Sequence, residues 1–163
     1  MCKLCDTDPT SHCFIKIDEG VYYSSVARCT DFTDATALAE HIKEVVIPNR
    51  PWIWIFDCKG ISAKHIAQFD VVRRVQQILF DDAYGGSMQR FVAVNMSAGA
   101  KKVIDMLSPF LTARARGNIV CCGTSPLEIM TGLSGHVPIS AMRWINRAAV
   151  LDVGETLPAI VTT

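Results

Sequence analysis

The stretch Asp57-Cys-Lys-Gly-Ile-Ser62 places an acid, a thiol, an amine and a hydroxyl directly after an apolar run. Cys58 and His65 flank the same turn, and a thiol beside an imidazole is the pairing that activates a cysteine nucleophile. Neither a glycine loop that could bind an oxyanion nor a third, orienting side chain accompanies this pair. We therefore expect no catalysis by this pair and predict that His65 lies in the first turn of a helix.

The N-terminal segment holds four side chains that can ligate zinc: Cys2, Cys5, His12 and Cys13. A typical structural zinc site uses two C-x-x-C knuckles, whereas the second pair here is an adjacent His-Cys. The C-x-x-C motif neither follows a strand nor opens a helix, which argues against a thioredoxin-like redox role. We predict no metal and no cofactor, and an irregular segment over residues 1–12.

The charge pattern gives no reason to expect nucleic acid as a partner. Sixteen basic residues balance sixteen acidic ones, and no long run of one sign occurs. The start lacks the apolar core of a signal peptide, and charged residues interrupt every stretch long enough to span a membrane. We therefore expect a soluble, cytoplasmic protein with reduced cysteines.

Apolar spacing predicts strands that alternate with helices. The predicted strands cover 14–17, 21–27, 52–56, 91–95 and 118–122. Helices are predicted from residue 33 with Asp31 or Thr33 as cap, from Ala63 to Asp82 as one long helix, around 103–111, from 125, and from 138.

This alternation implies an α/β domain with a mixed, mostly parallel sheet covered by helices. Ser125, Pro126 and Glu128 form a complete capping box, which fixes one helix start. We expect a single domain over residues 13–150, with 151–163 as a C-terminal tail.

Three motifs occur in order along the chain. They are the turn Asp57–Ser62 after a strand, the segment Arg90-Phe-Val-Ala-Val-Asn95, and Ser108-Pro-Phe-Leu with a later strand that ends in Gly123. Across roughly residues 14–135 they resemble the CRAL-TRIO lipid-binding family, which includes phosphatidylinositol and tocopherol transfer proteins. The resemblance implies a sheet floor with helices that close an apolar cavity, and a non-enzymatic role.

The resemblance also implies a lipid or another small hydrophobic molecule as ligand, with transient contact to a membrane surface. The candidate cavity lining is Trp52, Trp54, Phe56, Phe69, Val72, Phe91, Ala93, Leu107 and Phe110. A basic rim that would suit an anionic membrane consists of Lys101, Lys102, Arg114 and Arg116.

Two features depart from the family pattern. Phosphatidylinositol binders of the family use a glutamate after the long helix and a lysine before the later strand, and the matching positions here are Gly86 and Asn118. Strand alternation would also present Trp52, Trp54 and Phe56 on the cavity face, where phospholipid carriers have small polar side chains. Such aromatics could line the cavity or fill it, because each buries about 150–250 Å².

Two other functions remain open. One is a protein-interaction module with a self-filled core and no lipid cargo. The other is a STAS-type regulatory domain, because Ser62 lies at a strand-to-helix turn like the phosphorylated serine of that family. The aspartate-serine-serine/threonine-glycine signature of that family is absent, so we expect Ser62 to cap the following helix.

Overall fold

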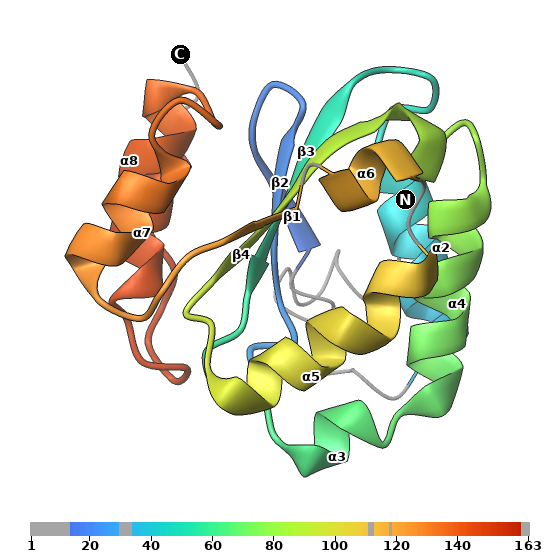
Figure 1. The fold of residues 1–163 in the computed structure, drawn as a ribbon, viewed down its shortest axis with the longest axis horizontal. Coiled ribbons are helices and arrows are strands. Elements are labelled where there is room, and N and C mark those ends of the chain that lie inside the picture. Colours follow the sequence, from blue (N-terminus) through green and yellow to red (C-terminus); the bar gives the residue numbers. More distant parts are fainter. Residues whose placement is uncertain (1–13, 30–33, 111–112, 118, 161–163) are drawn as a thin grey trace.

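A five-stranded sheet in the order β1-β2-β3-β4-β5 forms the centre of the molecule (Figure 1). The computed structural model describes residues 14–29, 34–110, 113–117 and 119–160. The strands are β1 (Phe14–Asp18), β2 (Val21–Ser25), β3 (Trp52–Asp57), β4 (Met88–Val94) and β5 (Ile119–Cys121). β1 runs antiparallel to β2 as the predicted hairpin, and the other neighbours are parallel. The predicted α/β class with a mixed, mostly parallel sheet is confirmed.

Helices cover both faces of this sheet (Figure 1). One face lies under α2 (Ala35–Val45) and α4 (Phe69–Phe80), with α5 (Ala98–Leu107) and α6 (Ala113–Gly117) beside them. The opposite face lies under α7 (Pro126–Leu133) and α8 (Ile139–Ala149). Short elements α3 (Ala63–Ile66), η1 (Gly85–Ser87) and η2 (Ser108–Phe110) connect the larger ones. Among the described residues, no helix combines the length and the apolar character needed to cross a membrane.

Strand alternation divides the buried side chains into two clusters. On β3, Trp52, Trp54 and Phe56 face α2 and α4, whereas Ile55 faces α7 and α8. We call the first cluster the aromatic core. Its large members are Phe14, Tyr22, Leu38, Ile42, Trp52, Trp54, Phe56, Val71, Ile78, Leu79, Met88 and Phe91.

The long helix predicted from Ala63 to Asp82 is wrong in its extent, because two helices occupy this stretch. The amide of Ala67 donates to the carbonyl of Ala63 (3.0 Å), which closes α3. Gln68 then leaves the helical path at ψ +70°, and α4 begins at Phe69. No proline or glycine marks this break, so local sequence gave no sign of it.

Two predicted helix starts can be compared with the structure. The helix predicted from residue 33 begins at Ala35, where the Asp34 Oδ1 accepts from the Ala37 amide (3.0 Å). The predicted caps Asp31 and Thr33 lie outside the described residues. The predicted capping box of α7 is confirmed, since Ser125 Oγ accepts from the Glu128 amide (3.2 Å) and Glu128 Oε2 from the Ser125 amide (3.0 Å).

Gly85 and Gly86 provide a matched test of the turn between α4 and β4. A Cβ on Gly85 would lie 1.9 Å from the Leu79 carbonyl oxygen, whereas one on Gly86 would lie 3.6 Å from the Asp82 side chain. We expect Gly85→Ala to lower the free energy of unfolding by about 1–3 kcal/mol, because the backbone at Leu79 must move to make room for the Cβ. Gly86→Ala should change it by less than about 0.5 kcal/mol. Urea denaturation of both variants measures the difference, and equal midpoints would contradict this packing.

Candidate functional site

A buried carboxylate organises the carboxyl ends of the central strands. Asp57 ends β3 and is 0% exposed. Its Oδ2 accepts from the Tyr23 hydroxyl (2.5 Å), and its Oδ1 accepts from the Asn95 side-chain amide (2.9 Å) and the Lys59 backbone amide (3.0 Å). Because β2, β4 and the following turn each supply one donor, this single side chain holds three segments in register.

Asn95 extends the network to the opposite helical layer. It follows β4 with φ +55°, a conformation that Asn tolerates better than most residues. Its Nδ2 also donates to the carbonyl of Ala149 at the end of α8 (3.1 Å). Asp57, the first residue of one motif, and Asn95, the last residue of the other, therefore have an architectural role: they join the strands to each other and to α8.

The segment after α8, predicted as a tail, lies against this corner. Arg28 is only 8% exposed and donates to the carbonyls of Leu151 (3.1 Å), Val153 (3.2 Å) and Glu155 (2.8 Å). Gly60, at φ +81°, leaves room for the segment, since a Cβ there would lie 2.8 Å from the Val153 side chain. The segment after α8 thus packs against this corner.

Cys58 and His65 do not form a nucleophilic pair. Cys58 is buried, and this burial, together with the neighbouring Asp57 carboxylate, raises the pKa of its thiol to about 12. His65 Nδ1 instead accepts from the Ser62 amide (3.0 Å) and lies 3.1 Å from the Ser62 hydroxyl. Burial, with the adjacent Lys64, lowers the pKa of His65. Ser62 is an N-cap, as expected, although it caps the short α3.

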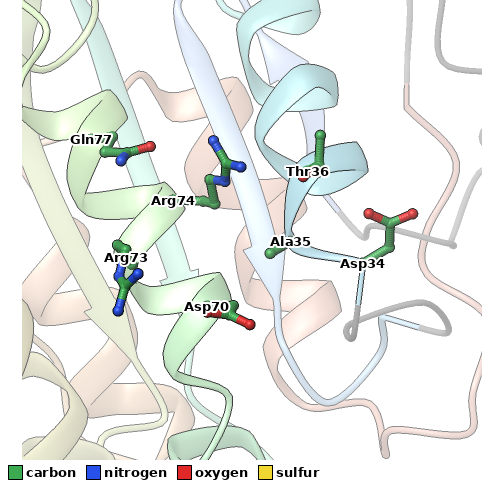
Figure 2. A pocket seen from close by; sticks show the side chains of 7 residues that line it. All are labelled: Asp34, Ala35, Thr36, Asp70, Arg73, Arg74 and Gln77. Atoms are coloured by element: carbon green, nitrogen blue, oxygen red, sulfur yellow. The ribbon is translucent and has the colours of Figure 1, made fainter.

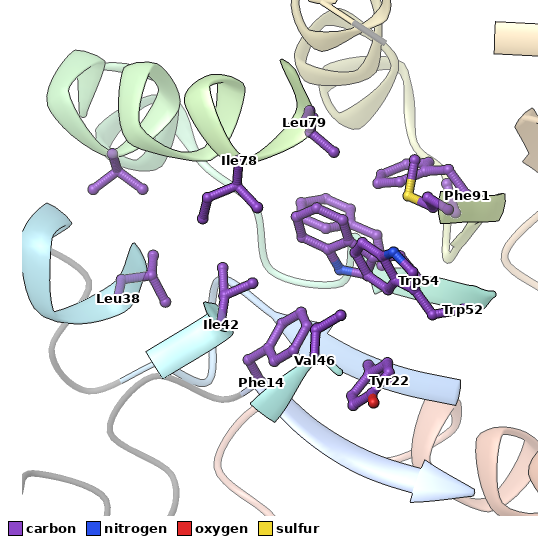
Figure 3. Close-up of a cluster of buried hydrophobic side chains, with 14 of the residues drawn as sticks. Phe14, Tyr22, Leu38, Ile42, Val46, Trp52, Trp54, Ile78, Leu79 and Phe91 are labelled. Carbon is purple, nitrogen blue, oxygen red and sulfur yellow. The ribbon is translucent and has the colours of Figure 1, made fainter. Parts of the chain in front are cut away.

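The aromatic side chains of β3 pack against one another on the face under α2 and α4 (Figure 3). Trp52, Trp54 and Phe56 are only 2%, 4% and 6% exposed. The rings of Trp52 and Trp54 stack with centroids 5.8 Å apart, and Phe91 contacts Trp54 at 5.5 Å and Phe56 at 5.7 Å. Both indole N–H groups are satisfied, by Tyr84 O (2.8 Å) for Trp52 and Ser24 Oγ (2.7 Å) for Trp54.

The predicted cavity lining falls into three groups. Trp52, Trp54, Phe56, Phe91 and Ala93 belong to the aromatic core. Phe69 is 68% exposed at the start of α4, and Val72 is half-buried outside that core. The side chains of Leu107 and Phe110 lie outside the described ones. Contact of these residues with a ligand stays a prediction.

Side-chain size changes across the same face of the sheet. Phe56 of β3 is in register with Ala93 of β4, and Ala93 with Cys121 of β5. Cys121 is exposed and lies on the α5 side of β5, since Cys122 belongs to the cluster under α7 and α8. Large rings therefore cover β3 and reach Phe91 of β4, whereas the next position on this face is small on both outer strands, as Ala93 of β4 and Cys121 of β5.

Comparison with models of known families identifies the family of this chain. The model of the CRAL/TRIO domain matches residues 24–142, which is more than half of the chain. The protein belongs to the CRAL/TRIO family. Domains of this family are generally non-enzymatic modules that bind lipids. The family resemblance that the ordered motifs indicated is confirmed. The match to this family argues against the STAS-type interpretation of the Ser62 turn.

A solved structure shows the same fold. The crystal structure of Sfh5 is similar to this CRAL/TRIO domain with a TM-score of 0.51 and 14% sequence identity, over 64% of this chain and 44% of that chain. The chain therefore spans less than half the length of the Sfh5 chain. No curated protein sequence matches it.

The basic rim of this CRAL/TRIO domain is described in part. Lys101, Lys102 and Arg116 are exposed, and Lys101 pairs with Asp105 on α5 at 3.1 Å. The side chain of Arg114 lies outside the described ones. Gly86, at the position where family phosphatidylinositol binders have a glutamate, lies in η1, and Asn118 is outside the described residues.

Metal binding by the N-terminal cysteines stays untested. Cys2, Cys5, His12 and Cys13 lie outside the described residues. Within residues that the structure does describe, no group of three or more His, Cys, Asp or Glu side chains is arranged to hold a metal ion.

Sequence reasoning missed a hollow that lies between α2 and α4. Seven polar or small residues surround about 660 Å³ there (Figure 2). They are Asp34, Ala35, Thr36, Asp70, Arg73, Arg74 and Gln77. Charged residues on the outer face of one helix look like an ordinary solvated surface, and only the packing of α2 beside α4 brings these side chains around one space.

Asp57→Ala should be strongly destabilising because it removes the acceptor of two buried donors, from Tyr23 and Asn95, and of the part-buried Lys59 amide. Each buried group left unsatisfied costs about 1–3 kcal/mol, so we expect the free energy of unfolding to fall by at least about 2 kcal/mol. Asp105→Ala is the control, since Asp105 forms an exposed i,i+4 pair worth about 0.3–0.5 kcal/mol. Chemical denaturation compares the two. A loss for Asp57→Ala no larger than that of the control would show that the network is not structural.

Thiol alkylation should distinguish the cysteines by burial. Burial raises the pKa of Cys58 to about 12 and of Cys122 to about 11, so both remain protonated thiols at neutral pH. We expect iodoacetamide at about pH 8 to label the exposed Cys121 in the folded protein, and to label Cys58 and Cys122 only after urea unfolding. Peptide mass spectrometry follows each site. Rapid labelling of Cys58 in the folded protein would restore the nucleophile hypothesis.

Proposed function

We propose that this CRAL/TRIO domain is a non-enzymatic module that binds a small hydrophobic molecule between the β4–β5 half of the sheet and the helices α5 and α6. The change in side-chain size across the sheet supports this proposal. Trp52 and Trp54 occupy the β2–β3 half and have no free polar group to offer a ligand. Ala93 and Cys121 occupy the other half.

The aromatic core limits the size of this ligand. A phospholipid needs room for two acyl chains, whereas two buried indole rings remove about 150–250 Å² of accessible surface each. The ligand that fits beside them is a single apolar body shorter than a phospholipid. Phe56 and Phe91, stacked at 5.7 Å, would form its wall on the side of the core.

A phosphatidylinositol head group is not part of this proposal. Gly86 replaces the glutamate of the family's phosphatidylinositol binders and offers no side chain to a head group. The exposed Lys101 and Lys102 on α5 would instead favour transient contact with an anionic membrane surface during ligand exchange.

A protein-interaction module without cargo is the second candidate. It is favoured by the packing of the aromatic core, where Trp52, Trp54 and Phe56 are buried by their neighbours alone. In that case the apolar side chains on this face of the sheet are buried without a ligand. The two candidates differ in whether the purified domain carries or takes up an apolar molecule.

Solvent extraction and native mass spectrometry of the purified domain test the first candidate. We expect one apolar molecule per chain, or saturable uptake of an offered fluorescent fatty acid. Cys121→Trp should reduce uptake at least about tenfold, because a large side chain fills the small-residue half. Thr131→Trp adds the same ring to the outer face of α7 and should leave uptake unchanged.

The outcomes separate the candidates. Absence of any extracted molecule together with absence of uptake would reject the ligand-binding module and favour the protein-interaction module. Uptake that Cys121→Trp and Thr131→Trp affect equally would reject the proposed place of binding and leave the ligand-binding function standing.

A further inference from the structure

The cleft between α2 and α4 has the size of a small-molecule site but not the lining of a lipid site. Its volume of about 660 Å³ lies within the range of about 300–1,000 Å³ found for ligand pockets. Side chains from the start of α2 and from the outer face of α4 surround it (Figure 2). Every side chain except that of Ala35 is polar or charged, so an apolar ligand gains little there.

Two adjacent guanidinium groups supply the positive charge of this cleft. Arg73 and Arg74 both line it, and both are exposed. Among the described residues, no ion pair or hydrogen bond holds either guanidinium. Consecutive helical residues point about 100° apart, so a phosphate that contacts both guanidinium groups must lie between the directions of the two side chains. Guanidinium groups bind phosphate through paired N–H donors, which favours an anionic oxygen ligand here.

The α2 wall adds donors and limits where an anion can lie. Thr36 contributes a hydroxyl, and the amino end of α2 carries partial positive charge. One oxygen of the Asp34 carboxylate, Oδ1, already accepts from the Ala37 amide at 3.0 Å. Asp34 and Asp70 repel a ligand that is anionic throughout. They accept from hydroxyl groups, so the ligand must combine one anionic group with hydroxyl donors.

We propose that the α2–α4 cleft binds a phosphomonoester carried on a small hydroxylated group, with the phosphate on Arg73 and Arg74. The hydroxyl groups donate to Asp34 and Asp70. Such a phosphomonoester can be a free metabolite or the head group of a lipid. The site is separate from the proposed apolar site, since α4 turns its buried residues Val71, Ile78 and Leu79 toward the aromatic core.

Binding would also stabilise the packing of α2 beside α4 over the aromatic core. Leu38 and Ile42 of α2 pack in the same core as Val71 and Ile78 of α4. A ligand that binds only the folded state raises the melting temperature, and the stabilisation grows with the logarithm of the ligand concentration above Kd. The proposal therefore has a stability readout as well as a binding readout.

Isothermal titration with glycerol 3-phosphate tests the free form of the ligand. We expect saturable one-to-one binding, a rise in melting temperature, and weakening of both as salt increases. The double variant Arg73→Ala with Arg74→Ala should raise Kd at least about tenfold, because charge-assisted hydrogen bonds are lost. Arg143→Ala with Arg147→Ala removes the same charge from the exposed face of α8 and should leave Kd unchanged.

Sedimentation with phosphatidylcholine vesicles that contain phosphatidic acid tests the lipid-borne form. If binding depends on Arg73 and Arg74 in the vesicle assay but not in the titration, the ligand is a membrane head group. If binding depends on them in the titration but not in the vesicle assay, the ligand is a free metabolite. Absence of saturable binding in both arms, or equal loss in the α4 and α8 double variants, would overturn the proposal. Neither result bears on uptake of an apolar ligand.

Discussion

The Asp57 carboxylate, buried where β3 ends, sets the geometry of the carboxyl edge of the sheet. A carboxylate removed from water is costly unless donors surround it, so its neighbours have little freedom. Tyr23 from β2, Asn95 from β4 and the Lys59 amide fulfil this condition, at 2.5–3.0 Å. Asn95 also donates to Ala149, so the same carboxylate indirectly fixes the end of α8. Residues that look like an active site thus form the joint between sheet and helices.

A second buried charge extends this joint to the end of the described chain. Arg28 follows β2 and donates to three carbonyls between Leu151 and Glu155. Trp144 of α8 then donates to the carbonyl of Pro158 at 3.1 Å. Because backbone carbonyls accept these hydrogen bonds, the bonds fix the path of the backbone in this segment and constrain its side chains less. Residues 151–158 therefore help to close the corner at Gly60.

The two faces of the sheet leave different room for function. The face under α7 and α8 is closed by Leu133, Ala141, Trp144 and Ile145, all buried. The opposite face combines the packed aromatic core with small side chains at Ala93 and Cys121, and the helices α2 and α4 that cover it form the polar α2–α4 cleft. An apolar ligand and a phosphate-bearing ligand would thus occupy opposite sides of the same helical layer.

The amino-acid sequence determined the features that depend on local spacing. Apolar periods gave the strands and most helices, the Ser125–Glu128 capping box gave the start of α7, and the ordered motifs gave the family. Only the tertiary structure decided the break at Gln68, the exposure of Phe69 and the grouping of Arg73 and Arg74 with α2. It also decided that Arg28 holds the C-terminal segment. These features depend on which elements pack as neighbours, and contacts between residues far apart in sequence leave no periodic signal in either partner.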